Sequence, residues 1–182
     1  MSTNYRITDQ SRPHFLTLTL VEWVDLFTRE KYKEIIMDSL RFCIEEKGLV
    51  LYAYVIMSNH VHLIVRSKNE ELSSTIRDLK RYTSKMIFEQ LSKDSNESRK
   101  NWLLWIFKSQ GAKSNSNRNF KVWQHENHPV ILDSNSIQDQ KLNYIHLNPV
   151  RAGICRSPED YVYSSADAYA GGTPTIPIEF IQ

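Results

Sequence analysis

The sequence LVLYAYVIMSNHVHLIVR occupies residues 49–66 and predicts a β-hairpin. Its first part, Leu49–Met57, is almost wholly apolar and rich in strand-forming residues, which indicates a central strand covered on both faces. Ser58-Asn59 predicts a short turn, and His60–Arg66 predicts the second strand. An apolar hairpin of this kind needs helices to cover it, and the flanking sequence supplies them.

On the N-terminal side, Phe15–Val21 alternates apolar residues with threonine, which predicts a half-buried strand. The run Arg29–Lys47 repeats apolar residues at helical spacing, with Thr28 as the expected N-cap and Gly48 as the stop. On the C-terminal side, Leu72–Leu91 shows the same spacing and predicts a second amphipathic helix.

The next elements are a short aromatic helix at Trp102–Phe107, a strand at Phe120–Gln124 and a short strand at Val130–Leu132. A third helix is expected over Ser136–Leu147, ended by Asn148-Pro149, because the residue before proline avoids helical geometry. The order strand, helix, strand, strand, helix, strand predicts an α+β, ferredoxin-like βαββαβ sandwich. Two helices would cover one face of an antiparallel sheet, and the extra C-terminal helix would lie elsewhere.

The length of 182 residues, with 41% hydrophobic and 24% charged residues, indicates one globular domain across residues 1–182. Within it we expect a loose arm at 1–13, a basic and aromatic insertion at 93–119 and a tail at 150–182. The absence of a long apolar run predicts no membrane segment, and the polar N-terminus does not resemble a signal peptide. Cys43 and Cys155 have no metal-binding or disulfide spacing, so we expect a cytoplasmic protein.

The formal net charge of +2 is unevenly distributed. Residues 77–121 hold eleven basic and four acidic side chains, which favours a polyanionic partner such as DNA, although a solvated helix face would give the same pattern. Trp102, Trp105 and Phe107 could stack on unpaired bases or belong to the core. The candidate DNA-binding residues are Arg77, Lys80, Arg81, Lys85, Lys113, Arg118, Lys121 and Gln124.

Two histidines stand one residue apart in the second hairpin strand. Because strand side chains alternate between faces, His60 and His62 should project together, while Val61 and Leu63 face the core. Two imidazoles on one face of a rigid strand supply half of a divalent-metal site. A surface pair without a ligand is the alternative.

The run YIHLNPVRAG places Tyr144 and Asn148 four residues apart on the third expected helix. Residues at this spacing share a helix face, so a phenol would lie one turn from a carboxamide that could complete a metal site. Packing of the tyrosine and capping by the asparagine is the alternative. His125 and His128 follow Trp123-Gln124 in a predicted loop, and neither is expected to be a metal ligand.

Three motifs occur together in one order: the NHVHL strand, the Trp123-Gln124 dipeptide and the YIHLNPVRAG helix. These motifs resemble those of the single-tyrosine HUH transposases of the insertion-sequence type, and most closely those of their REP-associated branch. The resemblance covers residues 14–165. The segment 93–119 is longer and more aromatic than the corresponding segment of the compact family members, so the resemblance assigns it no role.

The resemblance implies a metal-dependent endonuclease and strand transferase for single-stranded DNA, acting beside hairpins through a 5′-phosphotyrosine. It implies Tyr144 as the nucleophile and His60, His62 and Asn148 as ligands of Mg²⁺ or Mn²⁺. His146 falls on a different helix face and takes no such role. The protein could act as a monomer or a homodimer.

The sequence is also compatible with other functions. A catalytically inactive relative could bind DNA hairpins with the same fold. Replication initiators and relaxases of the wider HUH class usually have longer chains. An unrelated metal-binding or RNA-binding ferredoxin-like protein would be favoured if the two histidines did not face Tyr144.

Overall fold

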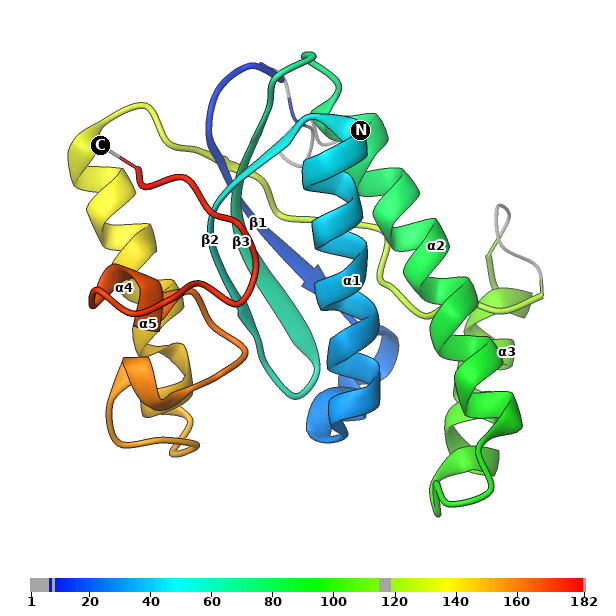
Figure 1. Ribbon diagram of the computed structural model, residues 1–182. Helices are drawn as coiled ribbons and strands as arrows, with labels where there is room; N and C mark the ends of the chain where they lie inside the picture. Colours follow the sequence, from blue (N-terminus) through cyan, green and yellow to red (C-terminus); the bar gives the residue numbers. More distant parts are fainter. Residues whose placement is uncertain (1–6, 8, 115–118, 182) are drawn as a thin grey trace.

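The computed structural model describes residues 7, 9–114 and 119–181. Within this part of the chain, four strands form one antiparallel sheet in the order β2-β3-β1-β4. Figure 1 shows the sheet between a pair of helices and a separate C-terminal helix. The strands are β1 (His14–Thr19), β2 (Leu49–Ile56), β3 (His60–Ser67) and β4 (Val130–Ile131).

One face of the sheet is covered by α1 (Glu30–Lys47) and α2 (Leu72–Lys93). Alternate residues of the strands, including Leu16, Leu18, Val61, Leu63 and Val65, enter the core beneath these helices. The helix α1 ends at Gly48, which adopts φ 65°, a left-handed conformation that glycine accepts without a steric penalty.

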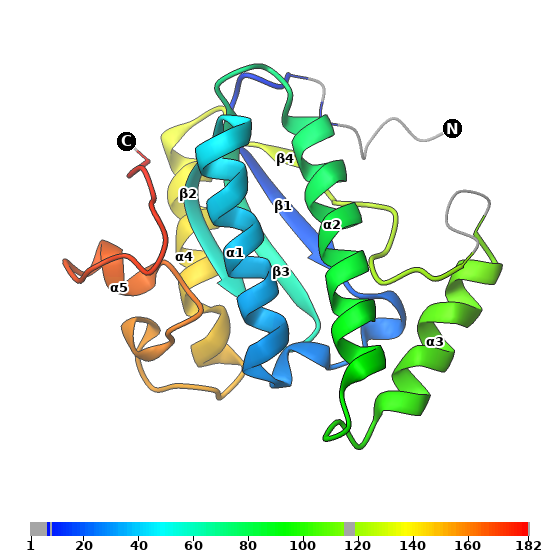
Figure 2. The same cartoon turned by 45° about the vertical axis from the view of Figure 1, so that its right-hand side comes forward.

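The opposite face is covered by α4 (Asn135–Arg151), as Figure 2 shows. Phe15, Val50, Ile64, Leu132 and Ile145 form the second core between α4 and the sheet. The predicted α+β, ferredoxin-like fold is therefore confirmed, and the extra helix lies on the face that α1 and α2 leave open.

The fourth strand lies later in the chain than its strongest sequence signal. We expected it at Phe120–Gln124, but that segment forms only an isolated bridge between Leu20 and Trp123. The strand that pairs with β1 is β4, in register Phe15 with Val130. The apolar residues of segment 120–124 pack against neighbouring elements instead. Phe120, for example, stacks on Phe88, with ring centroids 4.1 Å apart.

Two helix ends also differ from expectation. The helix α4 continues through Pro149, which is buried, and ends at Arg151. The proline is tolerated because only two residues of helix follow it and burial of its ring compensates for the lost backbone donor. At α1 the N-cap is Arg29 instead of Thr28, whose hydroxyl donates to the carbonyl of Asp25 at 3.0 Å.

The predicted insertion contains α3 (Lys100–Ala112), which is longer than the expected Trp102–Phe107. Phe107 is fully buried, whereas Trp102 and Trp105 are half or more exposed. Only the two tryptophans are therefore available to an external partner.

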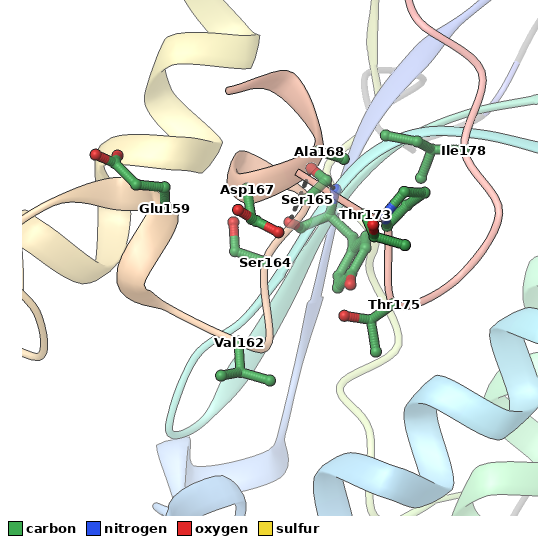
Figure 3. Close-up of a pocket in the computed structure, with 11 residues that line it drawn as sticks. Glu159, Val162, Ser164, Ser165, Asp167, Ala168, Thr173, Thr175 and Ile178 are labelled. Atoms are coloured by element: carbon green, nitrogen blue, oxygen red, sulfur yellow. Dashed lines mark hydrogen bonds between the residues drawn. The ribbon is translucent and has the colours of Figure 1, made fainter. Parts of the chain in front are cut away.

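The chain after α4 returns along β2. It contains two short helices, η3 (Pro158–Asp160) and α5 (Ala166–Tyr169). The amides of Ile56 and Glu179 donate to the carbonyls of Tyr163 and Leu51, each at 2.9 Å. A pocket of about 120 Å³ lies between this tail and Tyr54 of β2. Figure 3 shows Ser165 and Thr175 in its wall. No helix in the described parts of the chain is long and apolar enough to cross a membrane.

Candidate active site

The two strand histidines project from β3 on the side facing α4. The ring centroids of His60 and His62 lie 4.5 Å apart, as their spacing predicts. His60 is partly exposed, and its Nδ1 forms a hydrogen bond with Asn59 Oδ1 at 2.7 Å. His62 lies deeper and is buried. The pair therefore offers one imidazole at the surface and one within the site.

His62 is held by the neighbouring strand. Its Nδ1 lies 3.0 Å from Thr17 Oγ1, and its ring stacks on Phe15 with centroids 5.1 Å apart. Burial, followed by the nearby His60 and Lys141, lowers the pKa of His62 to about 3. The imidazole is therefore neutral at physiological pH, the form that binds metal ions.

The second nitrogen of His62 is buried and has no hydrogen-bond partner among the described residues. Buried polar atoms are rarely left unpaired, so an unpaired nitrogen beside a second histidine is consistent with a metal-binding role. In the tautomer whose Nδ1 donates to Thr17 Oγ1, the lone pair of Nε2 is free to coordinate a metal ion. This arrangement fits a divalent metal ion.

Tyr144 faces the histidines from α4. Its ring centroid lies 5.2 Å from that of His62 and 5.9 Å from that of Phe15. The side chain is 38% exposed, so a substrate can reach its hydroxyl. The neighbours Ile145 and Pro149 are buried against the sheet and fix the orientation of the helix.

Lys141 lies one turn before Tyr144 on the same face of α4. Its Nζ is 4.7 Å from the centroid of Phe15 and 5.8 Å from that of Tyr144, which are cation–π distances. It forms no ion pair with a carboxylate in the described part of the chain. An unpaired ammonium here can attract an anion to the phenol.

Asn148 follows Tyr144 by one turn and is half-buried. Its carboxamide makes no hydrogen bond to another described residue, so its oxygen is available. Within the described residues, no cluster of three His, Cys, Asp or Glu side chains occurs. The adjacent rings of His60 and His62 are thus the pair that could hold a metal here, and Asn148 stays the predicted third ligand.

Three of the predicted DNA-binding residues follow one exposed stripe of α2. Arg77, Arg81 and Lys85 have side chains 72%, 77% and 68% exposed. Their ion pairs with Asp78 and Glu89 lie at the surface, where such pairs contribute little, so the cations stay available to phosphates.

Lys80 differs from the rest of this set because its ammonium is used within the fold. It donates to the carbonyl of Gln124 at 2.7 Å and to Asn127 Oδ1 at 2.6 Å. Burial, together with Lys121, lowers the pKa of Lys80 to about 8. These contacts hold the 124–127 segment against α2, so we leave Lys80 out of the proposed DNA surface.

The other predicted DNA contacts lie around the end of α3. Lys113 is exposed, Lys121 is half-buried, and Gln124 donates to the carbonyl of Leu20 at 3.2 Å. Arg118 lies outside the described residues. His125 and His128 are exposed in the following loop.

His146 lies on a different side of α4 from Tyr144, as expected. Its Nε2 forms a hydrogen bond with Ser165 Oγ at 2.9 Å, and burial lowers the pKa of the imidazole to about 4. It links α4 to the C-terminal tail instead of joining the site.

Sequence reasoning missed three residues of the site. Lys141 carried a usable signal, because it precedes Tyr144 by one helical turn. Phe15 and Thr17 could be found only from the strand register, which sets Thr17 opposite His62.

An antiparallel ferredoxin-like sheet with two strand histidines facing a helical tyrosine defines a class of DNA-processing proteins. The model of the "Transposase IS200 like" family matches residues 13–126, and the chain belongs to this family. The match includes both histidines and ends before α4.

One solved structure supports the same fold. A REP-associated tyrosine transposase bound to a REP hairpin superimposes with a TM-score of 0.64, at 16% identity, over 100% of this chain and 94% of that chain. A protein of Deinococcus radiodurans R1 described as a candidate transposase covers 80% of this chain and 94% of its own, at 17% identity; its TM-score of 0.45 is too low to support the fold. No curated protein matches the sequence significantly.

Proposed function

We propose that the protein is a metal-dependent endonuclease and strand transferase for single-stranded DNA, acting beside a hairpin. The observation that carries this proposal is the 5.2 Å separation between the rings of His62 and Tyr144. It brings the exposed Tyr144 to His62, which itself lies beside His60, in a chain that belongs to the transposase family.

In the proposed reaction, the phenol oxygen of Tyr144 attacks the phosphorus of the scissile phosphodiester. The bond from phosphorus to the 3′ oxygen breaks, the phenol loses its proton, and the departing 3′ oxygen gains one. A 5′-phosphotyrosine forms and conserves the energy of the broken bond. Attack by a 3′-hydroxyl, from the same or another strand, releases Tyr144 and rejoins the DNA without a nucleotide cofactor.

His60, His62 and Asn148 are the proposed ligands of Mg²⁺ or Mn²⁺. These three side chains would hold the divalent ion, which when bound would supply Lewis acidity toward the scissile phosphate. Lys141 would contact the same phosphate and reduce its repulsion of the phenol oxygen, a role that its 5.8 Å distance from the Tyr144 ring supports. Phe15 and Thr17 keep the His62 ring in place.

The proposed site is complete within one chain. The tyrosine and the histidines that contact each other come from the same polypeptide, which supports cleavage by a monomer. A homodimer that exchanges its tyrosine helices would require α4 to leave the core formed by Ile145 and Leu132.

The proposed partner is a DNA hairpin with a single-stranded flank. Family membership supports DNA as the substrate, and the stripe of Arg77, Arg81 and Lys85 supports contact with phosphates. The structural relative at TM-score 0.64 is itself bound to a REP hairpin. Lys113, Lys121 and Gln124 would extend the contact toward His60.

A covalent-complex assay tests the proposal. The purified chain is mixed with end-labelled single strands from both flanks of its own gene, with Mg²⁺ or Mn²⁺, and separated on a denaturing gel. We expect a metal-dependent protein–DNA band that Tyr144→Phe abolishes. Tyr82→Phe is the matched control, because Tyr82 is 55% exposed on α2, away from the site.

Two other outcomes would contradict the proposal. A band that survives Tyr144→Phe would show that another residue is the nucleophile. Salt-sensitive binding without a band, on every flank and with either metal, would favour a hairpin-binding protein that does not cleave.

A further inference from the structure

Trp23 is displayed at the surface beside the candidate active site. It is 58% exposed, and it lies with the exposed Glu22 between the buried residues Val21 and Val24. Its ring centroid lies 6.3 Å from that of His60, edge to face. Single exposed aromatic rings are common, so the position of Trp23 becomes informative only together with its backbone and its neighbours.

The backbone at this position is held in an unfavourable conformation. Glu22 and Trp23 both have φ 52°, in the left-handed region that residues with a Cβ rarely adopt. The segment is fixed by hydrogen bonds from Leu20 to Asn59 (3.0 Å) and from Val21 to Val122 (2.9 Å). Strain of this kind persists where the surrounding structure imposes it, and it is concentrated at functional sites.

Trp23 forms one wall of a shallow hollow of about 290 Å³. Gln110, Lys121, Gln124 and His125 contribute polar groups to the same hollow. Its volume is near the lower end for small-ligand sites, which suits a flat, single-ring or double-ring ligand.

The polar groups of the hollow complement a nucleotide. The amide nitrogen of Gln124 donates to Leu20, so its oxygen is available to accept from a base edge. The side-chain amide of Gln110 donates a hydrogen bond to the carboxylate of Glu22. This bond holds the acidic group of Glu22 at the rim of the hollow. Lys121 has no carboxylate partner in the described part of the chain and could contact a phosphate.

We infer that this hollow binds one unpaired nucleobase of the cleaved DNA strand, stacked on the indole of Trp23. The inference rests on the proposed function, because it places that base next to the phosphate at His60 and Tyr144. Stacking on an aromatic ring accepts any base, and the amides and His125 would add preference among bases. The hollow would thereby fix which phosphate enters the site.

The test combines a variant of the protein with removal of single bases from the DNA. Binding of fluorescent single-stranded oligonucleotides is measured with an abasic site moved along the strand, for wild type, Trp23→Ala, Trp23→Phe and Trp105→Ala. Trp105 is the matched control, since it is 66% exposed on α3 and does not line the hollow. Circular dichroism and thermal unfolding check that each variant is folded.

We expect one abasic position to weaken wild-type binding about tenfold, in the range of base–aromatic stacking. The same abasic site should cause no further loss in Trp23→Ala, and Trp23→Phe should recover part of the difference. Trp105→Ala should respond as the wild type does. An abasic profile that is identical in wild type and Trp23→Ala would overturn the inference.

The covalent-complex assay on the same oligonucleotides separates the two proposals. A covalent band with wild type, together with an unchanged abasic profile in Trp23→Ala, rejects the base site and leaves the nuclease. A Trp23-dependent abasic position without any covalent band supports the base site and rejects cleavage.

Discussion

Tyr144 on α4 lies over His62 on β3, with ring centroids 5.2 Å apart and ring planes inclined by 68°. The two residues come from elements on opposite sides of an apolar core, which includes Ile64 and Ile145. Because α4 and β3 both pack on this core, the proposed nucleophile and the proposed ligand cannot separate without disrupting it. The candidate site is therefore pre-organised before DNA binds.

Lys141 gives a prediction about rate. Replacing it with glutamine should slow formation of the covalent complex on the order of 10²-fold, the loss typical when one charge-stabilising donor is removed. Lys141→Arg should keep most of the rate because it keeps the charge. Single-turnover kinetics at saturating DNA measure this effect apart from binding. Equal rates for Lys141→Gln and wild type would show that the ammonium does not contact the reacting phosphate.

His60 and Asn148 give a prediction about metal affinity. His60→Ala should weaken Mn²⁺ binding by more than about tenfold, as measured by calorimetry without DNA. Loss of a residue that merely hydrogen-bonds to a metal ligand already lowers metal affinity by about that factor. Asn148→Ala should also weaken it. His125→Ala, an exposed loop histidine, should bind as the wild type does. An unchanged affinity in Asn148→Ala would remove that residue from the proposed ligands.

His62 gives a prediction about acid stability. Its pKa is about 3 in the folded protein, against about 6.5 in an unfolded chain. Between these values the unfolded state binds the extra proton, so the free energy of unfolding should fall as pH decreases from 6.5 toward 3. The slope due to this residue is at most about 1.4 kcal/mol per pH unit.

Urea unfolding in metal-free buffer at several pH values measures that slope. His62→Gln should lose this contribution, whatever its effect on stability at neutral pH. If the variant and the wild type show the same pH dependence, the imidazole is not excluded from protonation in the folded protein.

The stripe on α2 gives a prediction about salt. Arg77→Gln and Arg81→Gln should each weaken DNA binding and reduce the slope of log affinity against log salt concentration by about one, the value for one lost phosphate contact. Arg41→Gln on α1 serves as the control of equal charge. Titrations at four or more salt concentrations measure the slopes, and identical slopes for all three variants would place the DNA elsewhere.

Thr83 gives a prediction about stability. Its hydroxyl accepts a hydrogen bond from Trp123 Nε1 at 2.9 Å, and both side chains are buried. Thr83→Val keeps the shape but leaves the indole N–H unpaired, which should cost about 1–3 kcal/mol of unfolding free energy. Thr83→Ser retains the hydroxyl and should recover part of this loss. A neutral Thr83→Val would mean that water or another acceptor takes over.

The side-chain alternation in HVHLIVR was sufficient to predict which face of the sheet carries His60 and His62. The short strand expected at Val130–Leu132 is present as β4, but the longer strand expected at Phe120–Gln124 is wrong, because that segment makes only one isolated bridge. Its apolar residues Phe120 and Trp123 contact α2 instead, through Phe88 and Thr83. The approach of Lys141 and Phe15 to Tyr144 depends on how α4 crosses the sheet. That angle follows from the packing of Ile145 and Pro149, which no local pattern encodes.

The return of residues 161–179 along β2 has a consequence for self-association. The backbone hydrogen bonds from Ile56 to Tyr163 and from Glu179 to Leu51 occupy the outer side of an eight-residue strand that is buried throughout. Without this cover, a long apolar strand would present unpaired donors and acceptors to other copies of the chain. The tail thus keeps the edge of β2 from pairing with other copies of the chain. A protein shortened before Tyr161 should therefore aggregate and be recovered mainly in inclusion bodies.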